Sequence, residues 1–129
     1  MTENVSHANR VAKADPRQAQ AYDWGSIQWL ASGRQIPDSQ LTFGYVQINP
    51  GVKNPKHFHP NCDEVLFVLE GELDHSLDDQ IFHLDPGMTI HIPAGVPHDA
   101  RNTGTSVARV VVAYSTGDRQ TTMCETGDE

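Results

Sequence analysis

The sequence predicts an all-β fold built as a single domain. Short runs rich in Val, Ile, Leu, Phe, Tyr and Trp recur along the chain, and Gly, Pro, Asn and Asp residues separate them. The 129 residues contain no internal repeat and no stretch with the composition of a linker. A chain of this length buries about two-thirds of its unfolded surface, which is enough for one core.

The individual strands follow from these runs. A polar turn at 32–39 separates the first two runs. Pro55 and Pro60 bracket the third run and argue against a helix there, and Gly71 ends the most apolar one. The segment Leu77-Asp-Asp-Gln80 has the composition of a hairpin turn. We therefore expect strands at 24–30, 41–48, 56–59, 64–69, 72–77, 80–84, 89–92, 98–102 and 108–115.

The chain divides into three parts by composition. Residues 1–23 are polar and rich in Ala and Gln, which predicts an N-terminal arm with a short helix at most. Residues 24–116 hold the predicted strands and form the barrel domain. Residues 117–129 are charged or small, which predicts a mobile C-terminal tail.

Two stretches of the chain supply the residues of a metal centre. The first is Gly51-x5-His57-x-His59-x4-Glu64-x6-Gly71, and the second is Gly87-x5-Pro93-x-Gly95-x2-His98-x3-Asn102. His57 and His59 are two residues apart, so on a strand they point to the same face. Three imidazoles and one carboxylate suit a single divalent transition metal per chain, with Fe, Mn, Ni, Co or Zn as candidates. Alone, a His-x-His pair, a Glu at a strand entry or a turn proline is commonplace, and the joint pattern favours the metal.

These two stretches resemble the two signature motifs of the cupin superfamily, and each signature position is matched. The resemblance covers residues 51–102 directly and 24–116 more loosely. It implies a double-stranded β-helix, a small jelly-roll barrel with the metal inside, and it carries the family's ligands over to His57, His59, Glu64 and His98. An octahedral centre with four protein ligands leaves two positions for water, oxygen or substrate.

Four other residues are candidates for shaping a substrate pocket. Tyr45 and Gln47 precede the first motif on a predicted strand, and either lines the pocket or simply packs. His75 shares the parity of Leu73 and Leu77, which suits an interior acid or base and equally a hydrogen-bonded core residue. Arg101 suits an acidic group of a substrate, although a surface ion pair is the commoner role for such an arginine.

The composition of the chain indicates which classes of partner and which cellular location to expect. The formal net charge is −8, which disfavours nucleic acid and anionic membranes as partners. No apolar run is long enough to span a bilayer, and the N-terminus lacks a signal-peptide core, so we expect a cytoplasmic protein. Cys62 and Cys124 make no disulfide framework. Both faces of the strand at 64–69 are apolar, as is the run 110–113, which predicts a homodimer unless the chain's own arm covers that face.

Three classes of function remain open, because cupins include enzymes, storage proteins and ligand-sensing domains. The first is a mononuclear metal-dependent dioxygenase acting on a small enol, diketone or flavonol, with Glu64 as a catalytic carboxylate. The second is a non-redox isomerase, cyclase or lyase acting on a keto or sugar-acid substrate. The third is a small-ligand-binding module without turnover. The sequence contains no attached DNA-binding helix pair and no second copy of the motifs.

Overall fold

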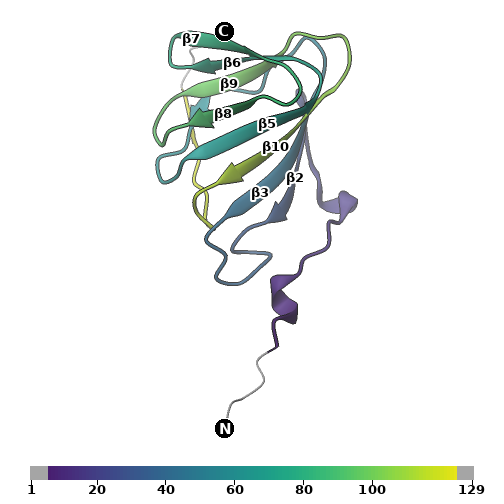
Figure 1. Cartoon of the computed structure of the whole chain (residues 1–129), viewed down its shortest axis with the longest axis vertical. Helices are drawn as coiled ribbons and strands as arrows, with labels where there is room; N and C mark the ends of the chain where they lie inside the picture. Colours follow the sequence, from purple (N-terminus) through teal and green to yellow (C-terminus); the bar gives the residue numbers. More distant parts are fainter. Residues whose placement is uncertain (1–5, 125–129) are drawn as a thin grey trace.

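The computed structural model describes residues 6–124 and shows the expected all-β, double-stranded β-helix (Figure 1). A six-stranded antiparallel sheet, called sheet A, faces a five-stranded antiparallel sheet, called sheet B. Sheet A has the order β1 (Gln20–Tyr22), β2 (Gly25–Ala31), β3 (Thr42–Ile48), β10 (Ala108–Tyr114), β5 (Glu64–Glu70) and β8 (Thr89–Ile92). Sheet B has the order β11 (Thr122–Met123), β4 (His57–Phe58), β9 (His98–Asn102), β6 (Leu73–Leu77) and β7 (Gln80–Leu84).

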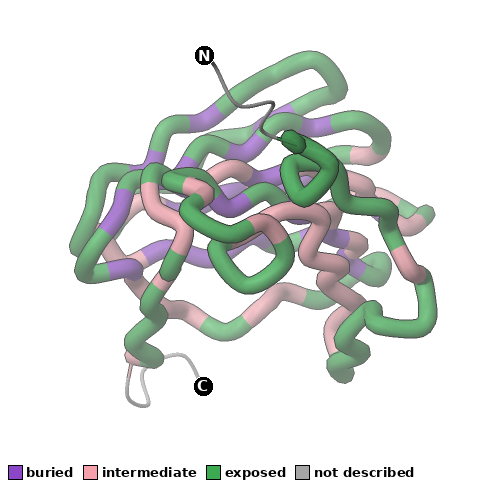
Figure 2. The backbone as a smooth tube through the Cα atoms, turned by 90° about the horizontal axis from the view of Figure 1, so that it is seen from below, coloured by how far each residue is buried: buried purple, intermediate pink, exposed green. Residues whose placement is uncertain are grey.

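Alternate residues of the strands fill the space between the sheets. Along β3, β5 and β10 every second side chain is buried, as the period of two of a half-buried strand requires. The buried stretches therefore lie inside the barrel, whereas the N-terminal arm is exposed along nearly its whole described length (Figure 2). The apolar core consists of Val46, Ile48, Cys62, Leu66, Val68, Leu73, Leu84, Ile90, Ile92, Ala100, Ala108, Val110, Val112 and Tyr114.

The ends of the chain hold more structure than the sequence suggested. The described part of the arm contains two 3-10 helices, Ala8–Arg10 and Pro16–Gln18, followed by β1, which pairs with β2. The expected mobile tail begins at residue 117, yet β11 pairs with β4. Two- and three-residue edge strands carry no recognisable period, so their sequences gave no signal. Residues 1–5 and 125–129 of the expected arm and tail lie outside the described residues.

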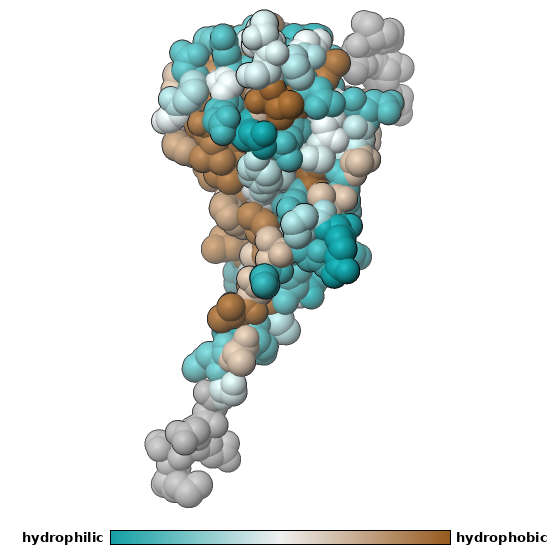
Figure 3. Space-filling model, turned by 90° about the vertical axis from the view of Figure 1, so that its right-hand side faces the viewer, coloured by the Kyte–Doolittle hydropathy of each residue, from teal (hydrophilic) through white to brown (hydrophobic). Residues whose placement is uncertain are grey.

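The outer face of sheet A is hydrophobic. Val65, Phe67 and Leu69 of β5 are 41%, 37% and 44% exposed, and Phe43 of β3 is 40% exposed. Hydrophobic residues gather along one flank of the molecule in the space-filling view (Figure 3). The described part of the arm leaves these side chains exposed. Among the described residues 6–124, no helix has the length and apolar composition needed to cross a membrane.

The ring of Trp29 packs directly over Gly44 and leaves no space for a side chain at this position. A Cβ at Gly44 would lie 2.8 Å from two ring atoms of Trp29 and 3.3 Å from Cγ2 of Val112. Real Cβ atoms do not approach so closely, so the ring would have to move inside a close-packed core.

We predict that Gly44→Ala lowers the free energy of unfolding by about 1–3 kcal/mol, the usual effect of overpacking a core. Urea denaturation monitored by circular dichroism measures it. The matched control is Gly104→Ala, because a Cβ there would meet no atom closer than 3.5 Å. Equal stability of the Gly44 variant and the parent would contradict the packing described here.

Candidate metal centre

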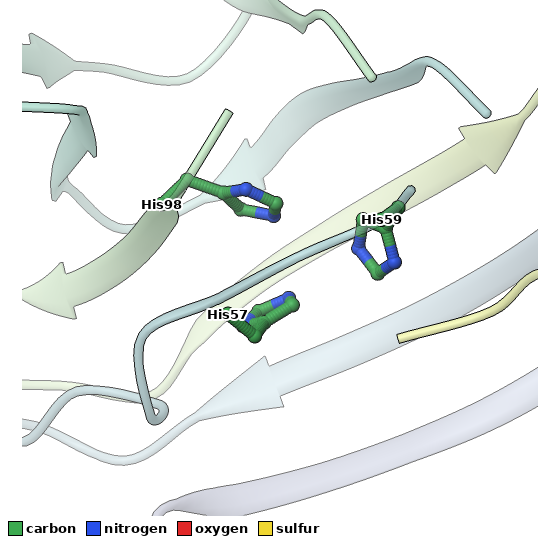
Figure 4. Close-up of side chains that lie close together, drawn as sticks. All are labelled: His57, His59 and His98. Carbon is green, nitrogen blue, oxygen red and sulfur yellow. The ribbon is translucent and has the colours of Figure 1, made fainter. Parts of the chain in front are cut away.

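Three histidines meet inside one end of the barrel. His57 lies on β4 and His98 on β9, and these two residues are paired across neighbouring strands of sheet B. His59 follows β4 directly. One ring nitrogen from each of the three lies within 4.8 Å of the others. The imidazoles turn toward a common space (Figure 4), with ring centroids 4.3 Å apart for His57 and His98 and 5.2 Å apart for His59 and His98.

Backbone carbonyls fix the orientation of all three rings. The Nδ1 atom of His57 is 2.7 Å from the carbonyl oxygen of Pro55, and that of His98 is 2.8 Å from the oxygen of Val96. The Nδ1 atom of His59 is 3.0 Å from the oxygen of Gln120. A carbonyl oxygen only accepts hydrogen bonds, so each neutral ring carries its proton on Nδ1. Each Nε2 therefore offers a lone pair, as a metal-binding histidine does.

Glu64, the first residue of β5, adds a carboxylate to this group. Its Oε1 atom is 3.3 Å from Nε2 of His59 and 3.2 Å from Nε2 of His98. These three atoms are buried and have no hydrogen-bond partner among the described residues. Three buried acceptors that face one another repel unless a cation lies between them.

The spacing and charge of this donor set fit a divalent transition metal. Neighbouring ligands of a metal with bonds near 2.1 Å lie about 3.0–3.4 Å apart, which matches the two contacts of Glu64. Burial alone would raise the pKa of Glu64, but the adjacent His59 and His98 side chains outweigh it and lower the pKa to about 2. Glu64 is thus ionised at neutral pH, and its negative charge complements a cation bound by the imidazole nitrogens.

Two of the interior histidines are held neutral. Burial, followed by the nearby His98, lowers the pKa of His57 to about 4 and that of His75 likewise to about 4. Burial also acts to lower the pKa of His98, but Glu64 outweighs it and the pKa is raised. His75 lies inside the barrel, as its parity suggested, and its ring stacks on His98 with centroids 5.7 Å apart. It donates from Nδ1 to the carbonyl oxygen of Ser76.

The other expected pocket residues lie elsewhere. Tyr45 and Gln47 belong to the outward-facing set of β3, where both bond to Arg109 at 2.8 Å. Arg101 is exposed on the outer face of β9. The structure therefore does not place these three side chains with the metal centre. Whether a strand residue faces the barrel interior or the outside depends on which alternate set of residues points inward, and the register of the sheet determines that set.

Three further residues lie around the centre without any local signal in the sequence. Tyr114, the last residue of β10, is paired with Glu64, and its ring lies 5.0 Å from that of His59. Burial, reinforced by the Glu64 carboxylate, raises the pKa of Tyr114 well above 10, so the phenol keeps its proton. Gln120 holds His59 through its carbonyl oxygen. Arg119 lies over the ring of Tyr114, 5.3 Å from its centroid.

A second group of possible ligands lies on the surface. Glu72, His83 and Asp85 are close together, but all three are exposed. The hydrogen bond to Asp74 raises the pKa of His83. Exposed acids around a histidine form solvated ion pairs without a metal, so we assign no site to this cluster.

Comparison with known proteins identifies the family and the fold. A family model described as "Cupin domain" matches residues 44–114. The chain is 35% identical over 91 residues to "Polyketide synthase CurC" of Streptomyces cyaneus, which covers 70% of this chain and 59% of the relative. The oxalate decarboxylase of Bacillus subtilis, studied for its Mn(II) centres, superposes with a TM-score of 0.74 at 16% identity, over 79% of this chain and 28% of that one.

An oxalate oxidase structure gives a similar result. It superposes with a TM-score of 0.73 at 22% identity, over 86% of this chain and 59% of that chain. At such identities the two superpositions show the fold alone. The chain spans 59% of the polyketide synthase relative and less than a third of the decarboxylase.

We predict that His57→Ala and His98→Ala each lower the affinity for divalent transition metals by at least about tenfold, because each removes one donor from the set. Elemental analysis of protein purified without a histidine tag, followed by titration of the metal-free form, measures the effect. His91→Ala is the control, since His91 is exposed and contacts Asp63 instead. Unchanged occupancy in a His57/His59 double alanine variant would refute the assignment.

Proposed function

The chain belongs to the cupin domain family, and from this membership and the geometry of the metal centre we propose that it is a metal-dependent enzyme acting on a small enol or β-dicarbonyl substrate. The first candidate is a dioxygenase that consumes oxygen. One observation supports the proposal above all others: the buried Nε2 atoms of His59 and His98 and the Oε1 atom of Glu64 face one another without hydrogen-bond partners among the described residues.

The proposed ligands are His57, His59, Glu64 and His98. When bound, a divalent metal supplies Lewis-acid chemistry, which lowers the energy of a substrate enolate. Iron and manganese also suit oxygen chemistry, and the Mn(II) of the decarboxylase makes manganese the first metal to test here. Zinc suits proton transfer alone, so the identity of the metal separates the redox candidate from the non-redox one.

The chain's own residues supply the remaining requirements. Glu64 is ionised at neutral pH, which is the form in which a carboxylate can act as a general base toward a substrate proton within hydrogen-bonding distance. Tyr114 keeps its proton, so its hydroxyl is available to donate to an oxygen that becomes negative during reaction. Gln120 and Val96 hold two of the imidazoles in place. The apolar core, including Val110 and Val112, excludes water from the inner side of the site.

A non-redox cyclase or isomerase is the second candidate. The resemblance to a polyketide synthase protein supports this second candidate, because polyketide intermediates contain β-dicarbonyl groups, which enolise readily. The same proton transfer at Glu64 serves this chemistry without oxygen. A ligand-binding module without turnover remains the third candidate.

We predict metal-dependent oxygen uptake with an enediol, a β-diketone such as acetylacetone, or a flavonol. Protein loaded anaerobically with Mn(II) or Fe(II) is screened in an oxygen electrode. Glu64→Gln should lower the rate by about 100-fold or more, because the amide cannot accept the proton. Arg101→Gln is the control, since Arg101 lies on the outer face of sheet B.

Two results would reassign the function. Substrate consumption at equal rates under nitrogen would favour the cyclase or isomerase. Binding of these compounds without turnover, with every candidate metal, would favour the binding module. Loss of uptake in Glu64→Gln must be accompanied by retained metal, measured in the same sample, because Glu64 is itself a proposed ligand.

We also propose that two copies of the chain associate through the outer face of sheet A. The exposed side chains of Phe43, Val65, Phe67 and Leu69 make this face apolar. Exposed apolar side chains clustered on one sheet face are unfavourable in water and typical of a permanent interface.

Light scattering at micromolar concentration is expected to give the mass of a dimer for the parent chain. The double variant Val65→Lys/Phe67→Lys places two charges in the interface and should be monomeric. Ile81→Lys is the control, because Ile81 is 68% exposed on β7 of the other sheet. A monomeric parent would show that this face meets solvent or another partner.

A further inference from the structure

A cavity that the metal centre does not use opens near one end of the barrel. Its volume is about 260 Å³, and its lining includes Gln20, Trp29, Ser32, Arg34, Asp118 and Arg119. The loop that follows β2 and the segment that follows β10 form its walls. The backbone N–H of Gly33 donates to the carbonyl oxygen of Gly117 at 2.8 Å, which ties the two walls together.

Two guanidinium groups line this cavity without an acidic partner. Neither Arg34 nor Arg119 forms an ion pair within the described residues 6–124. Asp118 lines the same cavity and offsets part of their charge, so the excess is one positive charge. In a chain whose formal net charge is −8, this local excess is the opposite of the average surface.

Arg119 is held in position by its neighbours. Its guanidinium carbon lies 4.3 Å from the centroid of the Trp29 ring and 5.3 Å from that of Tyr114. Its Nη1 atom also donates to the hydroxyl of Thr121. A guanidinium fixed over aromatic rings loses little side-chain entropy when it binds a ligand, and its planar donors match the two oxygens of a carboxylate.

The cavity adjoins the metal centre. Arg119, which lines the cavity, lies over the ring of Tyr114, and that ring lies 5.0 Å from the ring of His59. Gln120, the residue after Arg119, accepts the hydrogen bond from Nδ1 of His59. One aromatic ring thus separates the arginine from a proposed metal ligand.

From these contacts we infer that the cavity is an anion subsite, in which Arg119 and Arg34 bind the carboxylate of a small planar organic acid. The identification of that acid as part of the substrate rests on the proposed function, whereas the binding itself does not. The specificity is for charge: a carboxylate gains two charge-assisted interactions, and the corresponding amide does not. The volume of about 260 Å³ suits a compact acid with one ring.

The test uses benzoate and metal-free full-length protein. Trp24→Phe preserves a ring against Tyr22, on which Trp24 stacks, and leaves Trp29 as the sole tryptophan. Because Arg119 lies over Trp29, benzoate binding should change the emission of Trp29 in a saturable manner, and benzamide should not. Arg34→Gln and Arg119→Gln should each raise the dissociation constant by about tenfold or more, the loss expected for one charge-assisted contact.

The controls separate this subsite from the metal centre. Arg101→Gln removes the same charge from an exposed position on the outer face and should leave the dissociation constant unchanged. His57→Ala should also leave it unchanged in metal-free protein. Arg34 is exposed, so its variant remains informative if Arg119→Gln disturbs the packing of Trp29, which circular dichroism would reveal.

Three results would overturn the inference: no benzoate binding, equal binding of benzamide, or unchanged affinity in the Arg34→Gln/Arg119→Gln double variant. Loss of benzoate binding in His57→Ala would also overturn it, because the anion would then lie on the histidines. Metal titration of the same samples tests the proposed function separately. Binding of benzoate without binding of any metal would support the anion subsite and contradict the proposed metal-dependent enzyme.

Discussion

The close approach of three buried acceptors is the constraint on which this barrel depends. The Oε1 atom of Glu64 lies within 3.3 Å of Nε2 atoms on both His59 and His98. Those nitrogens face the Glu64 carboxylate because the Nδ1–H group of each ring donates to a backbone carbonyl on the other side. In water the acceptors would be hydrated, and inside the barrel they need a proton or a metal. The positions of β4, β5 and β9 place all three on the interior side, so the fold and the centre are specified together.

Much of this arrangement follows from the sequence because its signals are local. The apolar runs and turn residues predict nearly all the strands, and Gly51, Gly71, Gly87 and Gly95 have the positive φ angles that favour glycine in the turns of the two motifs. The spacing of the histidines fixes their common face as soon as a strand is assumed. The outward-facing apolar side chains of β5 also follow from alternation alone.

What the sequence could not provide depends on contacts between distant segments. The parity of Tyr45 and Gln47 is set by the pairing of β3 with β2 and β10, and it turns both side chains outward. Tyr114 meets Glu64 through a pairing between β10 and β5, fifty residues apart in sequence. Gln120 and Arg119 come from a segment whose composition resembles a mobile tail. No local pattern in that segment predicts that the carbonyl oxygen of Gln120 accepts a hydrogen bond from His59.

The distribution of polar groups inside the barrel has a thermodynamic consequence. One part of the interior is apolar, with Ile48, Val68, Leu73 and Val110 almost fully buried, and it carries the stability of the fold. The other part holds Glu64 and the histidines, whose burial opposes folding unless a cation is present. A ligand that binds only the folded chain stabilises it in proportion to the logarithm of its concentration over its dissociation constant. A metal at this centre would therefore raise the stability of the barrel as well as supply its chemistry. Without a metal, the acceptors that bind it stay buried and unpaired, which lowers the stability of the folded chain.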